Sequence, residues 1–335
     1  MIIDQKVLAK AEFAEIIGQE STKKQLKSAL IMGHHVIIVG PPGIGKTTLA
    51  RSLAKIMPET EANDCQYNCD PQKPLCPSCR QSKPKTKCLS AEQRFVRIQG
   101  SPDLTAEDLI GDIDPTKALK FGPLSMEAFS PGKIFKANNG VLFFDEINRC
   151  PEKLQNALLQ SLEEGRATVG TYDIELPANF VFIGTMNPDD TSTEKLSDVF
   201  LDRFDLIYMG YPETLETEEN IVLTKGKKLA LEFPKELLSL LVSFIQEIRS
   251  LDKLEKVPSV RATIRLYERS QSNAVLMGRK KVTLEDIAEA VVSVIAHRIR
   301  FKPSLQYLQD PEEFLRKEFK QYASDKYDKE TGGGL

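Results

Sequence analysis

Residues 36–47 read Val36-Ile37-Ile38-Val39-Gly40-Pro41-Pro42-Gly43-Ile44-Gly45-Lys46-Thr47. The first four are apolar and β-branched, as expected of a strand that is covered on both faces in a parallel sheet. The next eight fit the pattern G-x-x-x-x-G-K-[ST] of a phosphate-binding loop, and helical spacing continues from Thr47 to Ile56. Glycines let backbone N–H groups turn toward a phosphate at a helix N-terminus, where the helix dipole also favours an anion. This context favours a nucleotide site over a glycine-rich turn without a ligand.

The whole loop is therefore assigned to ATP and Mg²⁺. Lys46 is expected to reach the β- and γ-phosphates, and the hydroxyl of Thr47 is expected to bind Mg²⁺. The residues of this loop that are predicted to contact the nucleotide are Gly40, Pro41, Pro42, Gly43, Ile44, Gly45, Lys46, Thr47 and Thr48.

Strand-like runs recur further along the chain, separated by helical patterns. Buried strands are expected at Phe95–Ile98, Val141–Phe144 and Phe180–Ile183, and helices at Ala11–Met32 and Pro151–Glu164. The alternation predicts an α/β fold with a doubly wound parallel sheet, whose ligand sites lie at the carboxyl ends of the strands.

Polar residues follow two of these strands. Asp145 and Glu146 come directly after Phe144: Asp145 is expected to hold Mg²⁺ through water, and Glu146 to polarise the water that attacks the γ-phosphate. Asn187 follows the next strand, where it is expected to orient that water. Taken alone, the carboxylates fit a solvated strand end, and Asn187 fits a turn before Pro188. The phosphate-binding loop earlier in the chain favours the catalytic interpretation.

The pattern becomes helical after about Pro212. Helices are expected at Thr217–Ala230, Pro234–Leu251, Val260–Met277 and Thr283–Ile299, and no strand-like run appears among them. We therefore expect an ATPase domain at residues 1–211, a smaller all-α lid domain at 212–303 and a charged tail at 304–335.

Composition narrows the possible partners. The 335 residues carry 45 basic and 48 acidic side chains, a formal net charge of −3. This balance gives no whole-chain electrostatic argument for binding nucleic acid or an anionic membrane. No run approaches the roughly 18 apolar residues of a membrane span, and the first residues do not resemble a signal peptide. The chain is expected in the cytoplasm.

Five of the six cysteines lie within an insertion expected at residues 62–90. Four have spacings that let their thiolates converge on one tetrahedral ion, and the segment has little apolar surface with which to fold otherwise. Zn²⁺ is the first candidate and an iron–sulfur cluster the second, while unligated thiols and regulatory disulfides are the alternatives. The fifth, Cys88, is not assigned as a ligand, and the distant Cys150 is expected to be an ordinary buried residue. The four candidate ligands are Cys65, Cys69, Cys76 and Cys79.

Together these motifs resemble the AAA+ ATPases, and within them the group that joins the magnesium-chelatase ATPase subunit with the MoxR-type ATPases. Phe13–Gln19 resembles the entry segment of that family, which lies beside the adenine, and Ile17 is assigned to the nucleotide on that ground. Leu109–Asp114 is similar to part of the chelatase insert, expected at about residues 104–134, whereas Asp145–Arg149 is closer to the MoxR type.

The resemblance implies an arginine that acts between subunits. Leu201–Phe204 is similar to the L-D-R-F element of the family, in which Arg203 would serve the neighbouring subunit's nucleotide as an arginine finger. An ordinary ion pair with Asp202 or Asp205 is the alternative. Arg149 could also face the next subunit, although a solvated arginine at a helix start fits equally well.

A second phosphate-sensing arginine is implied in the lid. Val260–Thr263 resembles the start of the sensor-2 helix, which makes Arg261 the candidate and Arg265, one turn later, its rival.

The resemblance also implies an assembly and a task. A homo-oligomeric ring, hexameric by family resemblance, is expected to remodel a partner protein or support metal-ion insertion, with a separate protein carrying a von Willebrand A domain. A nucleic-acid translocase and a nucleotide-gated scaffold without turnover are the alternatives. The hairpin expected at Arg166–Leu176 has no Lys or Arg at its tip, which argues against a grip on phosphate. Glu146, Asn187 and Arg203 argue against the scaffold.

Overall fold

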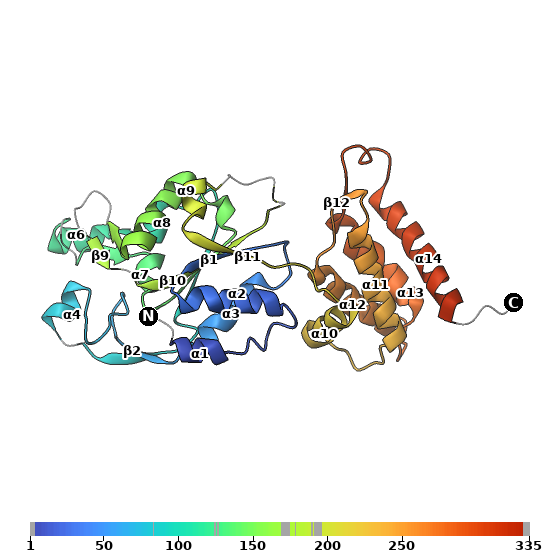
Figure 1. Ribbon diagram of the computed structural model, residues 1–335, viewed down its shortest axis with the longest axis horizontal. Coiled ribbons are helices and arrows are strands. Elements are labelled where there is room, and N and C mark those ends of the chain that lie inside the picture. The colour runs from blue at the N-terminus through green and yellow to red at the C-terminus, as the bar shows by residue number, and fades with distance from the viewer. Residues whose placement is uncertain are drawn as a thin grey trace. The chain divides into compact units, whose positions relative to one another are not determined.

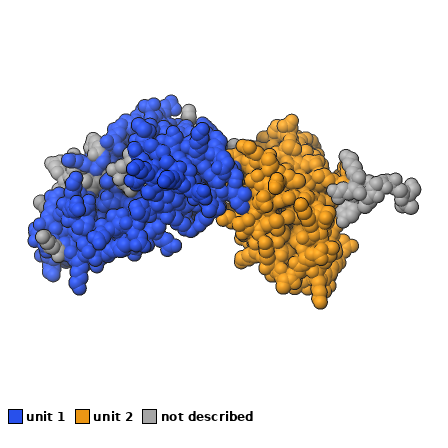
Figure 2. Space-filling model, turned by 60° about the horizontal axis from the view of Figure 1, so that its bottom comes forward, with its two compact units in different colours: residues 1–41, 45–209 blue, residues 42–44, 210–335 orange. Residues whose placement is uncertain are grey.

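The computed structural model describes residues 4–82, 84–123, 125, 127–168, 175–177, 179–188, 190 and 196–330. The chain divides into two compact units, residues 1–41 with 45–209 and residues 42–44 with 210–335 (Figure 2). The first unit contains the α/β domain. The second resumes at Gly210, two residues before the Pro212 boundary expected from the sequence.

A five-stranded parallel sheet forms the centre of the first unit (Figure 1). In spatial order the strands are β11 (Phe204–Tyr208), β1 (His35–Val39), β10 (Phe180–Met186), β7 (Gly140–Asp145) and β4 (Phe95–Gln99). The sequence predicts four of them, and these are confirmed. It misses β11, an edge strand with only two buried residues, Phe204 and Ile207, and a charged Asp205.

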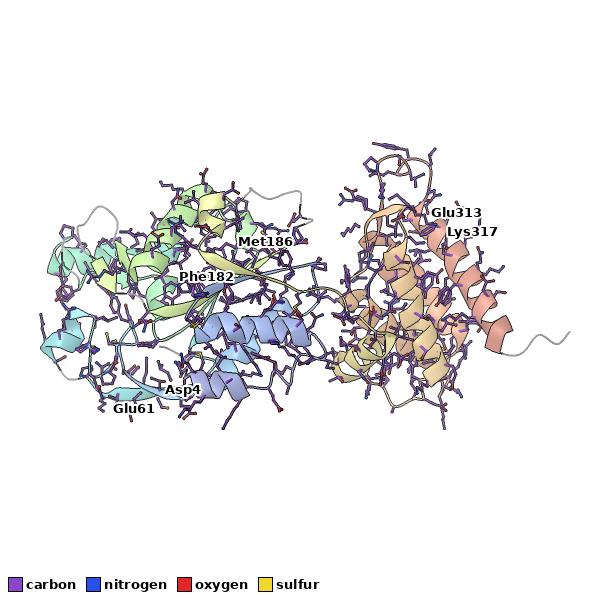
Figure 3. All side chains as sticks on the ribbon, in the orientation of Figure 1. Asp4, Glu61, Phe182, Met186, Glu313 and Lys317 are labelled. Carbon is purple, nitrogen blue, oxygen red and sulfur yellow. The ribbon has the colours of Figure 1, made fainter. Side chains whose placement is uncertain are left out.

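The strand ends that matter for function meet at one edge of this sheet. The phosphate-binding loop follows β1, Asp145 closes β7, and Asn187 follows β10. Figure 3 labels Phe182 within β10 and Met186 at its carboxyl end. Because the strands are parallel, the groups that follow them lie side by side.

Three longer helices accompany the sheet: α2 (Glu20–Ile31), α3 (Lys46–Ile56) and α8 (Glu152–Glu164). The helix predicted over Ala11–Met32 is wrong in its first half. Ala11–Gln19 is irregular, because Gly18 and Gln19 have positive φ angles of 69° and 61° that an α-helix does not accommodate. The short elements of this unit are α1 (Gln5–Lys10), β2 (Thr60–Asn63), α4 (Pro77–Gln81), β3 (Thr86–Leu89), α5 (Ala106–Leu109), β5 (Gly111–Ile113), α6 (Pro115–Phe121), β6 (Phe129–Pro131), α7 (Lys133–Lys136), η1 (Ile147–Arg149), β8 (Arg166–Thr168), β9 (Glu175–Pro177) and α9 (Asp198–Leu201).

Hairpins leave the sheet at the two predicted insertions. β2 pairs antiparallel with β3, and the cysteine-rich segment lies between them. β5 pairs antiparallel with β6 in the second insertion. β8 and β9 also pair antiparallel, while the tip of the hairpin expected at Arg166–Leu176 lies outside the described residues.

Aromatic side chains fill the core of the first unit. The Phe182 ring lies 5.2 Å from that of Phe204 and 6.3 Å from that of Phe144, and both Phe144 and Phe182 are fully buried. Each buried phenylalanine contributes roughly 1.5–3 kcal/mol through the hydrophobic effect. Cys150 is fully buried in the same core, as the sequence predicts.

The second unit is a helical domain with its own core. A buried Glu218 accepts hydrogen bonds from Arg249 Nη1 at 2.7 Å and from Thr263 Oγ1 at 2.6 Å, which satisfies a carboxylate that water does not reach. Two short strands, β12 and β13, pair antiparallel and are not predicted from the sequence. The elements are α10 (Leu215–Lys225), α11 (Lys235–Ser250), β12 (Leu254–Lys256), α12 (Val260–Leu276), α13 (Leu284–Ile295), η2 (Ala296–Arg298), β13 (Arg300–Phe301) and α14 (Pro311–Glu330).

Most of the charged tail expected at 304–335 is the helix α14, which the sequence analysis does not predict. Leu315, Phe319 and Ala323 recur every four residues and are buried, so they form an apolar stripe on an otherwise charged helix. The Phe319 ring lies 5.0 Å from that of Phe244 on α11. None of the helices in the described ranges is long and apolar enough to cross a membrane.

Candidate nucleotide-binding site

The loop after β1 has the backbone geometry of a phosphate-binding turn. Gly43 and Gly45 have φ angles of 76° and 107°, in the left-handed region that favours glycine. The Gly40 N–H donates to Met186 O at 3.1 Å, which ties the start of the loop to the end of β10. Lys46 opens α3 immediately after Gly45, so the loop ends at a helix N-terminus.

Lys46 folds back over the loop that precedes it. Its Nζ donates to Gly40 O and, at 2.8 Å, to Pro41 O. Thr47 and Thr48 lie in the first turn of α3, and the hydroxyl of Thr47 points toward Asp145, with 3.5 Å between Oγ1 and Oδ2. The structure therefore brings together the loop residues and the carboxylate that the sequence predicts for Mg²⁺.

Asp145 is held by groups from three other elements. Thr185 Oγ1 on β10 donates to its Oδ1 at 2.7 Å, and Arg97 Nη2 on β4 contacts its Oδ2 at 2.5 Å. The third element is α3, whose Thr47 hydroxyl faces the Asp145 carboxylate. Hydroxyl and carboxylate oxygens are ligands that Mg²⁺ prefers.

Glu146 lies in a turn that few residues can adopt. Its φ of 55° is left-handed, and its N–H donates to Thr185 Oγ1 at 3.0 Å. A Cβ on Gly100 would lie only 2.0 Å from Glu146 O, so this close approach requires glycine there. Gln99 Nε2 and Arg149 Nη1 contact Glu146 Oε2 at 2.9 and 3.1 Å. The carboxylate is thus oriented from β4 on one side and η1 on the other.

The sequence analysis misses four residues that shape this site: Arg97, Gln99, Gly100 and Thr185. They lie in or directly after the two strands that flank β7: Arg97 in the middle of β4, Gln99 and Gly100 at its end, and Thr185 near the end of β10. When β4 and β10 are known to pair with β7, polar residues near their carboxyl ends can be recognised as candidates to contact Asp145 and Glu146. The order of the strands in the sheet cannot be predicted from the sequence alone.

Asn187 follows β10 beside these groups. Its carbonyl accepts a hydrogen bond from Asn148 Nδ2 at 3.3 Å. Arg149 binds Asp190 as well as Glu146, with 2.6 Å between Nη2 and Asp190 Oδ2. Hydrogen bonding to the Asp190 carboxylate raises the pKa of Arg149. The structure therefore gives Arg149 two partners within its own chain.

Comparisons with known proteins agree with this geometry. Three family models match in succession: "Magnesium chelatase, subunit ChlI" at residues 12–69, the ATPase family associated with various cellular activities (AAA) at 81–206, and the AAA lid domain at 256–318. The magnesium-chelatase subunit ChlI-2 of Arabidopsis thaliana is 31% identical over 323 residues, which cover 87% of this chain and 76% of that protein. The chain belongs to the magnesium-chelatase ChlI family of AAA+ ATPases.

This ChlI-family chain is also similar to an archaeal homolog and to two solved structures. A ChlI homolog of Methanocaldococcus jannaschii is 28% identical over 324 residues, covering 87% of this chain and 86% of the homolog. Among solved structures, a complex between subunits BchI and BchD of magnesium chelatase matches with a TM-score of 0.50 at 22% identity, covering 90% of this chain and 98% of that one. A RuvB point mutant of Thermotoga maritima matches with a TM-score of 0.51 at 18% identity, covering 84% of this chain and 71% of that one. At these identities the structures show the fold, an α/β core with a helical lid. The MoxR part of the resemblance stays a prediction.

In this ChlI-family chain, Arg203 pairs with an acid that the sequence does not suggest. Its Nε binds Glu163 Oε1 on α8, and its Nη1 binds Val199 O. The alternative partners, Asp202 and Asp205, are wrong: no ion pair joins them to Arg203 in the described residues, and Asp205 binds His34 Nδ1 at 2.9 Å instead. The trans-acting role of Arg203 stays a prediction.

The lid arginines belong to the second unit. Arg261 is exposed at the start of α12, and Arg265 pairs with Glu268 at 3.0 Å. Desolvation lowers the pKa of Arg298, and the nearby charges of Arg265 and Arg261 lower it further. The phosphate-sensing role of Arg261 stays a prediction.

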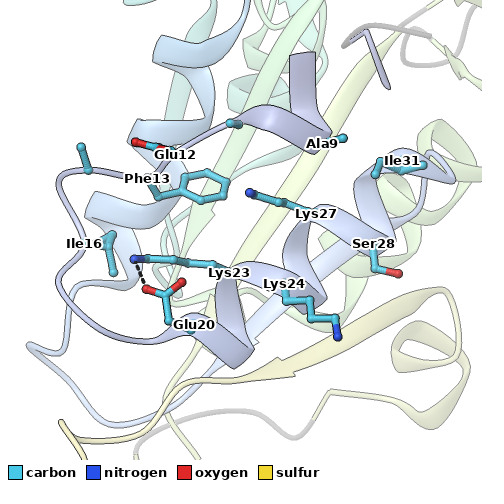
Figure 4. A pocket seen from close by; sticks show the side chains of 12 residues that line it. Ala9, Glu12, Phe13, Ile16, Glu20, Lys23, Lys24, Lys27, Ser28 and Ile31 are labelled. Carbon is cyan, nitrogen blue, oxygen red and sulfur yellow. Dashed lines mark hydrogen bonds and ion pairs between the residues drawn. The ribbon is translucent and has the colours of Figure 1, made fainter. Parts of the chain in front are cut away.

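The entry segment borders a hollow of about 720 Å³ along α1 and α2 (Figure 4). Lys23, Lys24 and Lys27 from α2 line it, and Lys23 pairs with Glu20 at 2.7 Å. The phosphate-binding loop and Asp145 are not among the residues that line this hollow, but Ile16, which lines it, lies beside the loop, 3.5 Å from where a Cβ on Gly45 would stand. Ile17 is half-buried and is not among its lining residues, and the role of Ile17 beside the adenine stays a prediction.

The structure brings the four predicted cysteine ligands together in the first unit. The Sγ atoms of Cys65, Cys69, Cys76 and Cys79 all lie within 4.8 Å of one another. Cys88 stands apart: it is exposed on β3, and its Sγ donates to Glu59 Oε2 at 3.3 Å.

Proposed function

We propose that this chain hydrolyses Mg-ATP at the carboxyl edge of the β1, β7 and β10 strands. The observation that carries the proposal is the cluster of Lys46, Thr47, Asp145 and Glu146, in which Thr185 Oγ1 bonds both to Asp145 and to the N–H of Glu146. Membership of the ChlI family supports the same reaction class.

Binding uses the loop and the start of α3. Lys46 Nζ exchanges its bonds to the loop carbonyls for oxygens of the β- and γ-phosphates, while backbone N–H groups at the helix N-terminus face the same anion. Thr47 and Asp145 supply the oxygen donors that would hold Mg²⁺. When bound, Mg²⁺ neutralises charge that develops on the phosphate oxygens.

Glu146 is proposed to polarise the attacking water. Gln99 and Arg149 both bind Oε2, so Oε1 is the oxygen proposed to accept the hydrogen bond from water. Asn187 is proposed to orient this water, and Arg261 to contact the nucleotide phosphates from the lid.

Phosphate release from the wild type, Glu146→Gln and Lys46→Ala tests this proposal. Glu146→Gln should lose about 10²–10⁴-fold in rate because it cannot take up the proton, while its affinity for Mg-ATP is retained. Lys46→Ala should lose both binding and turnover. Equal rates for the wild type and Glu146→Gln would remove Glu146 from the mechanism. Binding of ATP without any release by the wild type would favour a nucleotide-gated scaffold.

We further propose a homo-oligomeric ring in the cytoplasm, hexameric as in the wider family, with Arg203 completing the neighbouring subunit's site. The solved complex of BchI with BchD supports a partner protein in trans, and we expect this partner to carry a von Willebrand A domain. The task proposed for the ring is to remodel that partner or to support metal-ion insertion.

A further inference from the structure

The segment between β2 and β3 has few apolar side chains with which to fold. Tyr67 and Leu75 are its larger ones, and they are surrounded by charged and polar residues. Three of its four clustered cysteines, Cys69, Cys76 and Cys79, are nevertheless no more than 6% exposed. Tyr67 and Leu75 pack against the core of the first unit, and the buried sulfur atoms make up most of the remaining interior of the segment.

The spacing of the sulfur atoms fits a single metal ion. A tetrahedral Zn²⁺ with Zn–S bonds of about 2.3 Å keeps its sulfurs roughly 3.8 Å apart. The four Sγ atoms here all lie within 4.8 Å of one another. In an iron–sulfur cluster, the four thiolates are divided among two or more iron atoms and the body of the cluster separates them. So compact a set favours one ion over a cluster.

Backbone donors point at the same sulfur atoms. The N–H of Cys69 donates to Cys65 Sγ at 3.4 Å, and the N–H groups of Leu75 and Cys76 donate to Cys69 Sγ at 3.3 and 3.4 Å. Such donors stabilise the negative charge of metal-bound thiolates, whereas a disulfide sulfur is uncharged and accepts only weakly. All six cysteines are free thiols in the structure.

We propose that Cys65, Cys69, Cys76 and Cys79 bind one Zn²⁺ ion that folds the insertion. Zinc and iron are the two metals usually found in tetrahedral sites with four sulfur ligands. A thiolate site binds Zn²⁺ more tightly than Fe²⁺, so we expect zinc here. The family assignment does not supply this ion: the matched models end at residue 69 and resume at residue 81, so Cys76 and Cys79 lie between them.

The bound ion also supports the strand that carries the two carboxylates. Tyr67 O and Asn68 O accept hydrogen bonds from Asn138 Nδ2 and Asn139 Nδ2, each at 3.4 Å, and the Tyr67 ring lies 5.9 Å from that of Phe135. These contacts tie the cysteine segment to the turn before β7. The ion therefore stabilises the start of the strand whose other end is Asp145.

Metal analysis of the full-length wild type is the first test. Protein purified without chelators should contain about one zinc per chain. Replacement by Co²⁺ should give the thiolate charge-transfer and intense visible bands of a tetrahedral site with four sulfur ligands. Iron in place of zinc, zinc well below one equivalent, or a mass that shows disulfides in freshly isolated protein would each overturn the proposal.

Cysteine variants identify the ligands. Cys69→Ser and Cys76→Ser should lose the bound zinc, while Cys88→Ser, in the same hairpin but exposed, should keep it. Loss of zinc from Cys88→Ser as well, or its retention in Cys69→Ser, would overturn the ligand set.

Cysteine variants could lose zinc because they fail to fold, so hydrogen exchange of the wild type tests the proposal without any substitution. Removal of zinc with a mercurial reagent and a chelator should speed exchange in residues 64–85 and 138–140, and added zinc should restore protection. Unchanged exchange would show that the ion does not fold this segment. Because these readouts are independent of ATP turnover, failure here is distinguishable from failure of the proposed function.

Discussion

Thr185 is a single buried hydroxyl that serves both carboxylate residues of the site. It is fully buried on β10, where it donates to Asp145 and accepts the N–H of Glu146. Without the hydroxyl, the N–H of Glu146 loses its acceptor and Asp145 loses a donor that fixes its orientation. The positions of the two carboxylates are therefore coupled through one side chain.

Thr185→Val should lower the rate of phosphate release about 10–100-fold, because the displaced carboxylates no longer meet the reacting groups. The free energy of unfolding should fall by about 1–3 kcal/mol, since a buried polar group is left unsatisfied. Thr185→Ser keeps the hydroxyl and is the matched control. Both quantities are measured by phosphate release and urea unfolding, and normal turnover by Thr185→Val would contradict this account.

Some residues of the proposed site are predicted from local motifs, whereas the partners that hold other residues are recognised only in the folded structure. Lys46, Thr47, Asp145 and Glu146 follow from local motifs, because each motif is contiguous in the chain. The Glu163 partner of Arg203 does not, since α8 and Arg203 are distant in sequence.

At the scale of elements, His35 couples β1 to β10. Its Nδ1 accepts the N–H of Phe182 at 3.2 Å, and its ring stacks 6.2 Å from that of Phe180. Burial lowers the pKa of His35 from 6.5 to about 4, the backbone hydrogen bond with Leu162 opposes this, and the charge of His34 adds to it. The imidazole is therefore neutral in the folded chain at neutral pH.

The consequence is a loss of stability in acid. Between pH 6.5 and about 4 the unfolded chain binds a proton at His35 that the folded chain does not, so the free energy of unfolding falls as pH drops, by roughly 3 kcal/mol over the window. In His35→Asn, the side-chain oxygen can accept the Phe182 N–H without titrating. Urea unfolding at several pH values should give a shallower slope for His35→Asn than for the wild type, and parallel slopes would disprove the assignment.

The helix α14 is an integral part of the second unit. Phe319→Ala removes a ring that is 4% exposed and packs against Phe244, so it should lower the free energy of unfolding by about 3–5 kcal/mol. Tyr307→Ala is the control, because Tyr307 is 94% exposed and its replacement should change stability by less than about 0.5 kcal/mol. Chemical unfolding of both variants measures the difference. Equal stabilities would mean that α14 contributes little to this core.

At the scale of the whole molecule, the proposed active site contains residues of two neighbouring subunits. If Arg203 acts on the neighbouring subunit's nucleotide, Lys46→Ala and Arg203→Ala subunits should each be inactive alone but regain turnover when mixed. About a quarter of the interfaces in an equal random mixture then pair an intact loop with an intact arginine.

A second mixture is the control for this experiment. Lys46→Ala and Glu146→Gln remove groups from the same side of the site, so no interface in their mixture is complete and no recovery is expected. Phosphate release after mixing measures both cases. Recovery in neither mixture would place Arg203 within its own subunit's site or outside the mechanism.

Local pattern alone was sufficient for the α/β fold class and for four of the five strands, because each depends on contiguous residues. The nucleotide-binding roles of Lys46, Thr47, Asp145 and Glu146 stay predictions from the same kind of pattern. The same patterning placed the lid helices but missed α14, whose narrow apolar stripe becomes meaningful only against a partner such as Phe244. Tertiary structure decided the strand order β11-β1-β10-β7-β4, and with it the meeting of Arg97, Gln99 and Thr185 with the carboxylates. It likewise decided the convergence of the four cysteines. Parallel pairing and side-chain convergence join segments far apart in the chain, so no local signal specifies them.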